Sequence, residues 1–353
     1  MKYNLINGFY LKRKENEYLE HEVKFSTSEM ANLWSTFFND SLANNVLQYF
    51  LNNVEDVKVE EILNYALGVS QEHLQFLSEL FEENNFPIPA AFAPQDVNKN
   101  APRLYTDEFY LYYLKNMGMI GGNGYSLALG NAARLDVRNF FTKAITQSSN
   151  IYNMTSEILL EKGLFIRPPQ INIPKNVEFV TKQSFLSGWF GDRRPLTSIE
   201  VMNLFFNVER NDLGRSLLTG FQQVAQLKEV KDFVARGIKI ASKHIEVFGS
   251  VLSESELPTP MVWNTLPTDS TEFTFSDKLI MFHTTALTAA STSHYGTSLG
   301  SSPRRDLGAH YTRFVLEIMQ FAEDGANIMI NNGWLEQPPS AVDRQKLKKK
   351  NEN

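Results

Sequence analysis

The chain contains no cysteine among its 353 residues. This absence excludes disulfide bonds, thiolate metal sites, thiol redox chemistry and cysteine nucleophiles. It leaves the cellular compartment open, because a protein without thiols suits a reducing cytosol and an oxidising outer layer equally.

Long apolar runs and an excess of positive charge are missing as well. No run approaches the ~18 apolar residues that a membrane-spanning helix needs, and the charged N-terminal segment has no signal-peptide core. The net charge is −6, with most Lys and Arg interleaved with acidic residues. We therefore expect a soluble, cytoplasmic protein that binds neither nucleic acid nor a membrane. The basic run 346–350 is expected to be a solvated tail.

The sequence contains an internal repeat that covers most of the chain. Segment 70–77 (SQEHLQFL) matches 241–248 (ASKHIEVF) at an offset of 244 − 73 = 171, and residues upstream of it keep the same offset. Past a connecting segment the offset drops to 277 − 107 = 170, as a single deletion would produce. One register held from position 29 to position 169 excludes chance.

Each copy is predicted to form four helices. The first opens with a capping box, which begins at Ser26 in one copy and at Thr197 in the other. The second carries an apolar face at helical spacing, and this face includes His73 or His244. We therefore expect both histidines to be buried near the middle of their bundles.

The third helix of each copy begins at Asp107 or Asp277 and is rich in small residues, which allow close helix packing or mark a break. The fourth begins near Ala133 or Pro303. It ends at a glycine before a double proline, at position 163 or 333.

A Pro-rich segment, 86–106 or 257–276, joins the second and third helices of each copy. At about 3.3 Å per extended residue it can run the length of a helix bundle, which is the ferritin-like connection. The predicted fold is all-α, with two tandem ferritin-like four-helix bundles. The predicted parts are an N-terminal segment 1–25, a first bundle 26–169, a linker 170–196, a second bundle 197–339 and a basic tail 340–353.

Apolar residues in the linker are expected to dock onto the bundles. They are Phe185, Leu186, Trp189 and Phe190. Arginines at the start of each fourth helix, Arg134 and Arg304, are expected to pair with carboxylates on a neighbouring helix.

Several long motifs carry a family resemblance. They are 87–92 (PIPAAF), 96–98 (DVN), 101–107 (APRLYTD), 191–196 (GDRRPL), 324–330 (DGANIMI) and 333–339 (GWLEQPP). In these stretches the chain resembles DUF3231, an uncharacterised ferritin-like family of spore-forming bacteria. The resemblance implies one bundle per repeat and a distant likeness to spore-coat proteins, and it implies no activity.

A standard di-iron centre is excluded by the histidine pattern. Such centres take Glu-x-x-His from two helices. The residues three positions before the six histidines are Tyr18, Ser70, Ala241, Ile280, Ser291 and Leu307. None of them is glutamate.

A mononuclear metal site in the second copy is the alternative. His244 lies 244 − 228 = 16 residues into its helix and His294 lies 294 − 277 = 17 into the next, about 1.5 Å apart along the axes. His310 and Glu209 fall near the same level, so these four residues could bind one Zn²⁺, Mn²⁺ or Fe²⁺. The competing interpretation is that His244 is a hydrogen-bonded core residue, like His73 in the first copy, which lacks the other ligands.

Two functions follow from the sequence. The first is a structural or interaction protein, related to sporulation or the spore coat, that binds protein partners or itself. The second is a metal-binding, redox-capable bundle. The sequence carries no phosphate-binding Gly-rich loop and no nucleophile elbow, so it favours a protein that is not an enzyme and has no assigned small-molecule substrate.

Overall fold

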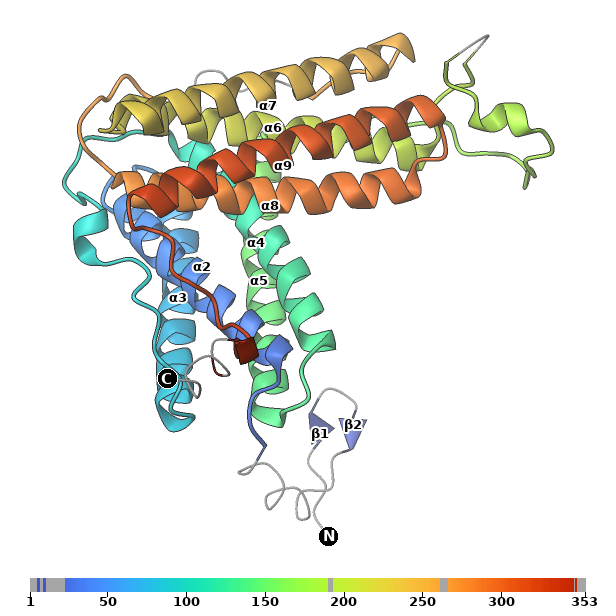
Figure 1. The fold of residues 1–353 in the computed structure, drawn as a ribbon. Coiled ribbons are helices and arrows are strands. Elements are labelled where there is room, and N and C mark those ends of the chain that lie inside the picture. Colours follow the sequence, from blue (N-terminus) through green and yellow to red (C-terminus); the bar gives the residue numbers. More distant parts are fainter. Residues whose placement is uncertain are drawn as a thin grey trace.

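Helices dominate the computed structural model (Figure 1). The structure describes residues 5–6, 9–10, 23–189, 193–260, 266–345 and 347. The first repeat forms α2 (Thr27–Leu51), α3 (Val57–Glu83), α4 (Asp107–Gly130) and α5 (Leu135–Glu161). The second forms α6 (Ser198–Val224), α7 (Lys228–Glu254), α8 (Asp277–Ser301) and α9 (Arg305–Asn331). The predictions of an all-helical chain and of two tandem repeats are confirmed.

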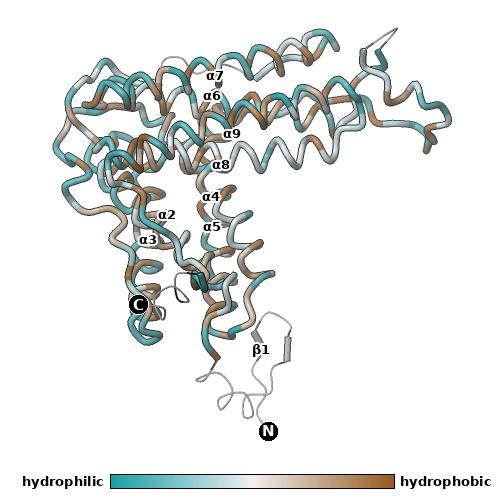
Figure 2. The backbone as a smooth tube through the Cα atoms, in the orientation of Figure 1, coloured by the Kyte–Doolittle hydropathy of each residue, from teal (hydrophilic) through white to brown (hydrophobic). Residues whose placement is uncertain are grey.

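The remaining elements are short. Two 3₁₀ turns, η1 (Pro94–Asp96) and η2 (Gln183–Leu186), lie in the first crossover and in the linker. Strands β1 (Leu5–Ile6) and β2 (Phe9–Tyr10) form an antiparallel pair. No helix in the described ranges is long and apolar enough to cross a membrane. Figure 2 shows hydrophobic and hydrophilic residues interspersed along most helices, and α8 coloured mainly in intermediate shades.

The predicted capping boxes are present, and their glutamates also join helices. Glu29 returns to the N-terminus of its own helix and accepts the backbone N–H of Arg134, at the start of α5, at 2.8 Å. Glu200 accepts the N–H of Arg304 at 3.2 Å in the same way. Each carboxylate therefore satisfies free N–H groups at the ends of two helices.

The other predicted helix ends are found within two residues. The Asp107 carboxylate accepts the N–H of Asp56 at 2.9 Å, so the start of α4 is tied to the start of α3. Asp277 accepts the N–H of Leu227 at 2.8 Å in the second repeat. Gly163 and Gly333 follow α5 and α9 with φ of +69° and +67°, a conformation that glycine adopts without strain.

The two crossover segments pair with each other through two isolated antiparallel bridges, Val97 with Phe275 and Tyr105 with Pro267. Their backbone hydrogen bonds run from Asn98 N to Thr274 O, Thr268 N to Leu104 O, Ser276 N to Asp96 O and Thr106 N to Leu266 O, at 2.8, 2.9, 2.8 and 3.0 Å. The repeat offset converts the first bond into the second, because 98 + 170 = 268 and 274 − 170 = 104. It converts the third into the fourth in the same way. The repeats are therefore related by a local twofold axis.

The twofold axis passes close to Tyr113 and His283. These residues are equivalent, since 283 − 113 = 170, and the Tyr113 hydroxyl lies 3.4 Å from His283 Nε2. Contact between equivalent positions is what a twofold axis requires. Burial lowers the pKa of His283 to about 3, so the imidazole is neutral on the axis.

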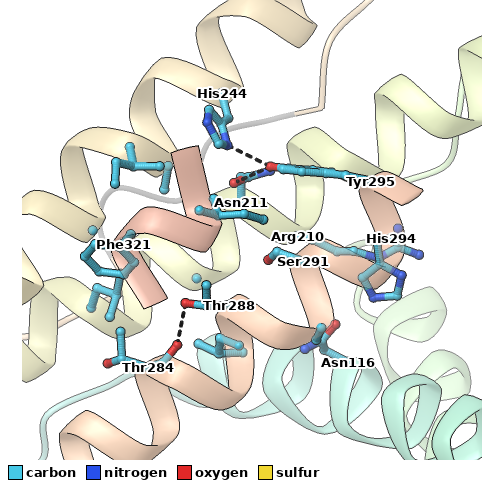
Figure 3. A pocket seen from close by; sticks show the side chains of 18 of the residues that line it. Asn116, Arg210, Asn211, His244, Thr284, Thr288, Ser291, His294, Tyr295 and Phe321 are labelled. Atoms are coloured by element: carbon cyan, nitrogen blue, oxygen red, sulfur yellow. Dashed lines mark hydrogen bonds between the residues drawn. The ribbon is translucent and has the colours of Figure 1, made fainter. Parts of the chain in front are cut away.

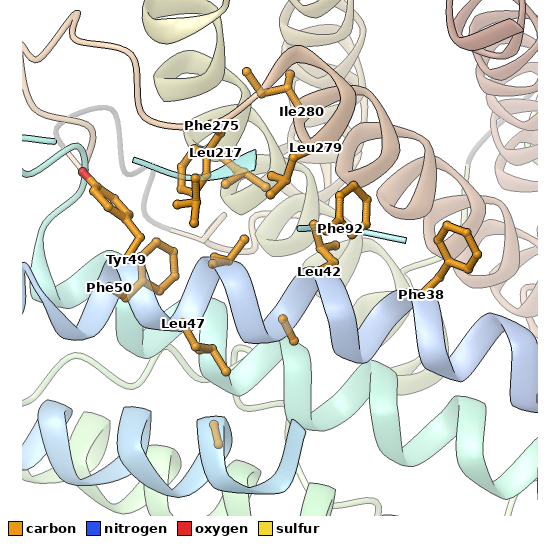
Figure 4. Close-up of a cluster of buried hydrophobic side chains, with 14 of the residues drawn as sticks. Phe38, Leu42, Leu47, Tyr49, Phe50, Phe92, Leu217, Phe275, Leu279 and Ile280 are labelled. Carbon is orange, nitrogen blue, oxygen red and sulfur yellow. The ribbon is translucent and has the colours of Figure 1, made fainter. Parts of the chain in front are cut away.

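Of the two hydrophobic clusters among the described residues, the smaller lies in the second repeat and the larger draws residues from both repeats. Figure 4 shows α2 of the first repeat facing α6 and α8 of the second across the larger cluster. The labelled side chains include Phe38, Leu42, Leu47 and Phe50 from α2, Leu217 from α6, and Phe275, Leu279 and Ile280 near or within α8. The repeats therefore form one packed unit rather than two independent domains. Figure 1 shows the helices of one repeat crossing those of the other.

The linker docks only in part. Phe185 lies under the Arg194 guanidinium at 3.9 Å and is half-buried, as is Leu186. Trp189 is 55% exposed, so its predicted docking is wrong. Phe190 lies outside the described residues.

The contact between the repeats predicts a selective effect of adding one methyl group. A Cβ at Gly220 would lie 2.4 Å from the Tyr105 hydroxyl, which donates to Leu217 O at 2.7 Å. Gly220→Ala should therefore lower the free energy of unfolding by about 1–3 kcal/mol. Urea unfolding measures the change.

Gly214→Ala in the same helix is the matched control. A Cβ there meets nothing within 4 Å, so this variant should be neutral or more stable by about 0.5–1 kcal/mol. Equal stability of the two variants would contradict the close approach of Gly220 to Tyr105.

Candidate functional site

The centre of the first repeat is a closed hydrogen-bond network around His73. Its Nδ1 lies 3.0 Å from Asp40 Oδ2, and its Nε2 lies 2.9 Å from Gln147 Oε1. Burial alone would lower the pKa of His73, but the hydrogen bond to Asp40 and the charge of that carboxylate outweigh it and raise the pKa. Burial raises the pKa of Asp40 as well. The pair therefore holds a proton between Nδ1 and Oδ2.

The same position in the second repeat has a different environment. His244 Nδ1 lies 2.8 Å from the Tyr295 hydroxyl, and Nε2 lies 3.1 Å from Glu317 Oε2. The residue equivalent to Asp40 is Asn211, since 211 − 171 = 40, so no carboxylate faces Nδ1. Burial lowers the pKa of His244 to about 4, against the hydrogen bond and charge of Glu317.

The two histidines are therefore buried structural residues, as their helix faces predict. Both nitrogens of each ring have a hydrogen-bond partner, which is what buried polar groups require. The pKa of His73 is raised by its carboxylate partner, and that of His244 is lowered by burial. The chemistry of the duplicated centre has diverged while its geometry has been kept.

The four residues of the predicted metal site do not gather around one point. Glu209 Oε1 accepts from Lys115 Nζ of the first repeat at 2.7 Å. His244 and His294 line one pocket, whereas Glu209 lines the neighbouring one and His310 lies beside Phe314. No group of three or more His, Asp and Glu in the described ranges could hold a metal ion. Counting residues along a helix gives the height of a side chain but not the direction in which it points. The observed contacts point the four side chains to different places, so the geometry does not support this site.

Metal content tests the four-residue site directly. With these contacts we expect less than one transition-metal ion per chain in protein purified without added metal, in the wild type and in His244→Ala alike. One ion per chain that is lost in His244→Ala would instead establish the metal site.

The arginines at the start of α5 and α9 pair within their own turn. Arg134 binds Asp136 through two hydrogen bonds of 3.1 and 2.6 Å, and Arg304 binds Asp306 at 3.0 and 2.5 Å. The expectation of a carboxylate on a neighbouring helix is wrong. The pairing itself is structural, since both carboxylates also lie at a helix N-terminus.

A pocket of about 80 Å³ opens between α8, α9 and the helices around them (Figure 3). The first repeat is closed at this place, because Gly118 lets α4 press on α5: a Cβ there would lie 2.8 Å from Ser148 O. The equivalent residue of α8 is Thr288, since 118 + 170 = 288. Its side chain, and that of Ser291 in place of Gly121, keep α8 further from α9.

Unpartnered polar atoms line this pocket. Arg210 Nε and His294 Nε2 are buried without a hydrogen-bond partner. Arg210 Nη2 donates to the Met119 sulfur at 3.4 Å, and the guanidinium lies 5.7 Å from the centre of the Phe206 ring. Sequence reasoning missed Arg210, although a comparison of the copies holds the signal: position 210 − 171 = 39 is an asparagine.

Comparison with known protein families also detects the duplication. A family model described as "Protein of unknown function (DUF3231)" matches residues 14–177 and again residues 184–347. The chain belongs to the DUF3231 family. This confirms the resemblance that the sequence motifs indicate. No curated protein sequence matches the DUF3231 chain.

One solved structure is similar to part of the DUF3231 chain. It is a Bacillus halodurans protein described as a "putative spore coat protein", 19% identical, with a TM-score of 0.40. The match covers 42% of the present chain and 98% of the other. A likeness this distant carries no argument about the DUF3231 protein.

The buried carboxylate of the first repeat predicts a large effect of removing its partner. His73→Ala should cost about 3–5 kcal/mol of stability, because it leaves Asp40 buried and unpaired. His244→Ala leaves no buried carboxylate at Nδ1 and should cost about 1–3 kcal/mol. Chemical denaturation measures both.

A double variant isolates the carboxylate. Asp40→Asn, which introduces the residue found in the second repeat, should restore part of the stability that His73→Ala removes. If the two changes are additive instead, Asp40 and His73 are not coupled.

The pKa values of the two histidines should be shifted in opposite directions from 6.5. His73 should titrate above 6.5, so its contribution to stability is present below pH 6.5 and is lost as the pH rises through the folded-state pKa. His244 should titrate near 4, so the unfolded chain takes up its proton first and stability falls between pH 6.5 and 4. NMR of ¹⁵N-histidine-labelled protein, with single variants for assignment, measures both. Coincident titrations would refute the divergence.

Proposed function

We propose that this protein is a structural or interaction protein that associates with a second copy of itself through its linker. The supporting observation is an uncovered apolar stretch at 171–180. Five large side chains there are exposed: Ile171 48%, Ile173 91%, Val177 85%, Phe179 84% and Val180 62%. Contiguous exposed apolar surface is typical of interaction sites.

The pattern within this stretch favours pairing as an extended strand. Four of the five apolar residues stand at odd positions, so they share one face of an extended chain. Such a segment binds a partner by adding a strand to it, with backbone hydrogen bonds for affinity and alternate side chains for specificity. This periodicity of two is visible in the sequence and contrasts with the helical periodicity on either side.

A second copy is the partner that the chain itself supports. Most soluble oligomers are symmetric homo-oligomers, and identical antiparallel strands give a twofold interface. The crossover segments already pair in this way within one chain. Assembly of identical units also fits a role in a spore layer, which the family resemblance suggests.

The proposal includes a ferritin-like bundle for each repeat. Its support is the connectivity: short turns join α2 to α3 and α4 to α5, and the long crossover 84–106 joins α3 to α4. Two such bundles fixed in one unit would space the linkers of neighbouring copies in a defined way.

Molar mass in solution tests self-association. Light scattering after size exclusion should give a mass above the 40.3 kDa of one chain, rising with concentration. The double variant Val177→Ser/Phe179→Ser should return the mass to that of one chain. Leu316→Ser/Met319→Ser on α9, whose side chains are 63% and 55% exposed, is the matched control and should leave the assembly intact. A wild-type chain that stays at 40.3 kDa at every concentration would refute the proposal.

A further inference from the structure

The pocket beside α8 contains an uncompensated positive charge. Lys115 and Glu209 form an ion pair of 2.7 Å next to it, so their charges cancel. Arg210 has no carboxylate within ion-pair distance in the part of the chain that the structure describes, and its Nε has no partner. Burial lowers the pKa of Arg210, yet a guanidinium stays protonated in the neutral range. A half-buried cation of this kind is costly unless an anion joins it.

A second unpartnered group stands beside this charge. Burial, together with the charge of Arg210, lowers the pKa of His294 to about 4, so the imidazole is neutral. Its Nε2 is buried and lacks a partner, and it can donate a hydrogen bond in the Nε2–H tautomer. Figure 3 shows Arg210 and His294 on one side of the pocket, with Asn116 of the first repeat close by.

The rest of the pocket combines an apolar wall with neutral polar side chains such as Thr284, Thr288 and Asn211. Ile120, Leu218, Leu287, Ile318 and Phe321 line it. Phe321 lies on the side opposite His294 in Figure 3. Small-molecule sites combine apolar walls with a few placed polar groups, and this pocket has both.

We propose that this pocket binds a monocarboxylate with an apolar body, with the carboxylate on Arg210 and His294 and the hydrocarbon between α6, α8 and α9. The planar guanidinium matches a carboxylate through two hydrogen bonds. The proposal is independent of self-association through the linker.

Charge and geometry exclude the competing ligands. A cation would be repelled by Arg210, and a neutral molecule would leave the guanidinium unpaired. Lys115 is already paired with Glu209, so the charge of Arg210 matches a singly charged anion better than a phosphate dianion. The first repeat has Asn39 and Gly124 in place of Arg210 and His294, so one site per chain is expected.

Calorimetric titration of the full chain with octanoate tests the proposal. Octanoate should bind at one site per chain, while octan-1-ol and inorganic phosphate should each bind at least about tenfold more weakly. Arg210→Gln should weaken octanoate by about tenfold or more. Arg138→Gln, at an exposed arginine on α5, removes the same charge and should leave the affinity unchanged.

A blocking variant keeps the test decisive if Arg210→Gln unfolds. Gly214 lines the pocket and has no heavy atom within 4 Å of its Cβ position. Gly214→Leu should therefore fill the pocket and abolish octanoate binding while the thermal unfolding of the chain stays near that of the wild type. Absence of octanoate binding to the wild type, equal affinity for octan-1-ol, tighter binding of phosphate, or binding untouched by Arg210→Gln or Gly214→Leu would each overturn the proposal.

Discussion

The antiparallel pairing of the two crossover segments is the contact on which the rest of the molecule depends. A crossover between helices has no internal partner for its backbone, and burying it unpaired would cost free energy for every orphaned N–H and C=O. Each repeat supplies the missing partner of the other through four backbone hydrogen bonds. Because the crossovers lie against the helices, this pairing fixes how the repeats cross and brings α4 onto α6. The Lys115–Glu209 pair and the pocket beside Arg210 are consequences of that docking.

Duplication let the two centres take different forms on one scaffold. In the first repeat Gly118 and Gly121 allow tight packing of α4 on α5, and His73 is locked to a buried carboxylate. In the second, side chains replace the glycines and an amide replaces the carboxylate. The first repeat is therefore tightly packed at this place, whereas the second leaves a pocket there. A single repeat could not combine both properties, since the same helix contact cannot be tight and open.

Local features of the fold could be predicted from the sequence. Capping boxes at Ser26 and Thr197, the acidic starts of α4 and α8 and the glycines after α5 and α9 act within a few residues, so the pattern contains them. The pairing of the crossovers joins residues about 170 positions apart and leaves no periodic trace.

The site was less accessible from the sequence, for a geometric reason. Counting residues along the helices placed four side chains at one height: His244, His294, His310 and Glu209. The direction of a side chain, however, depends on the rotation of its helix and on the surface that the helix packs against. Glu209 turns to Lys115 of the other repeat, which no count within one bundle can foresee. Arg210 could have been found by comparing the copies, because an arginine stands where the first copy has an asparagine.

Hydrogen exchange at the crossover amides tests the central claim most directly. The N–H groups of Asn98, Thr106, Thr268 and Ser276 donate across the repeat interface. If the pairing fixes the two repeats in one unit, these amides exchange only when the shared core opens, so their protection should approach that of the core helices. Exchange at all four as fast as in the exposed stretch 171–180 would show that the repeats are not fixed by this pairing.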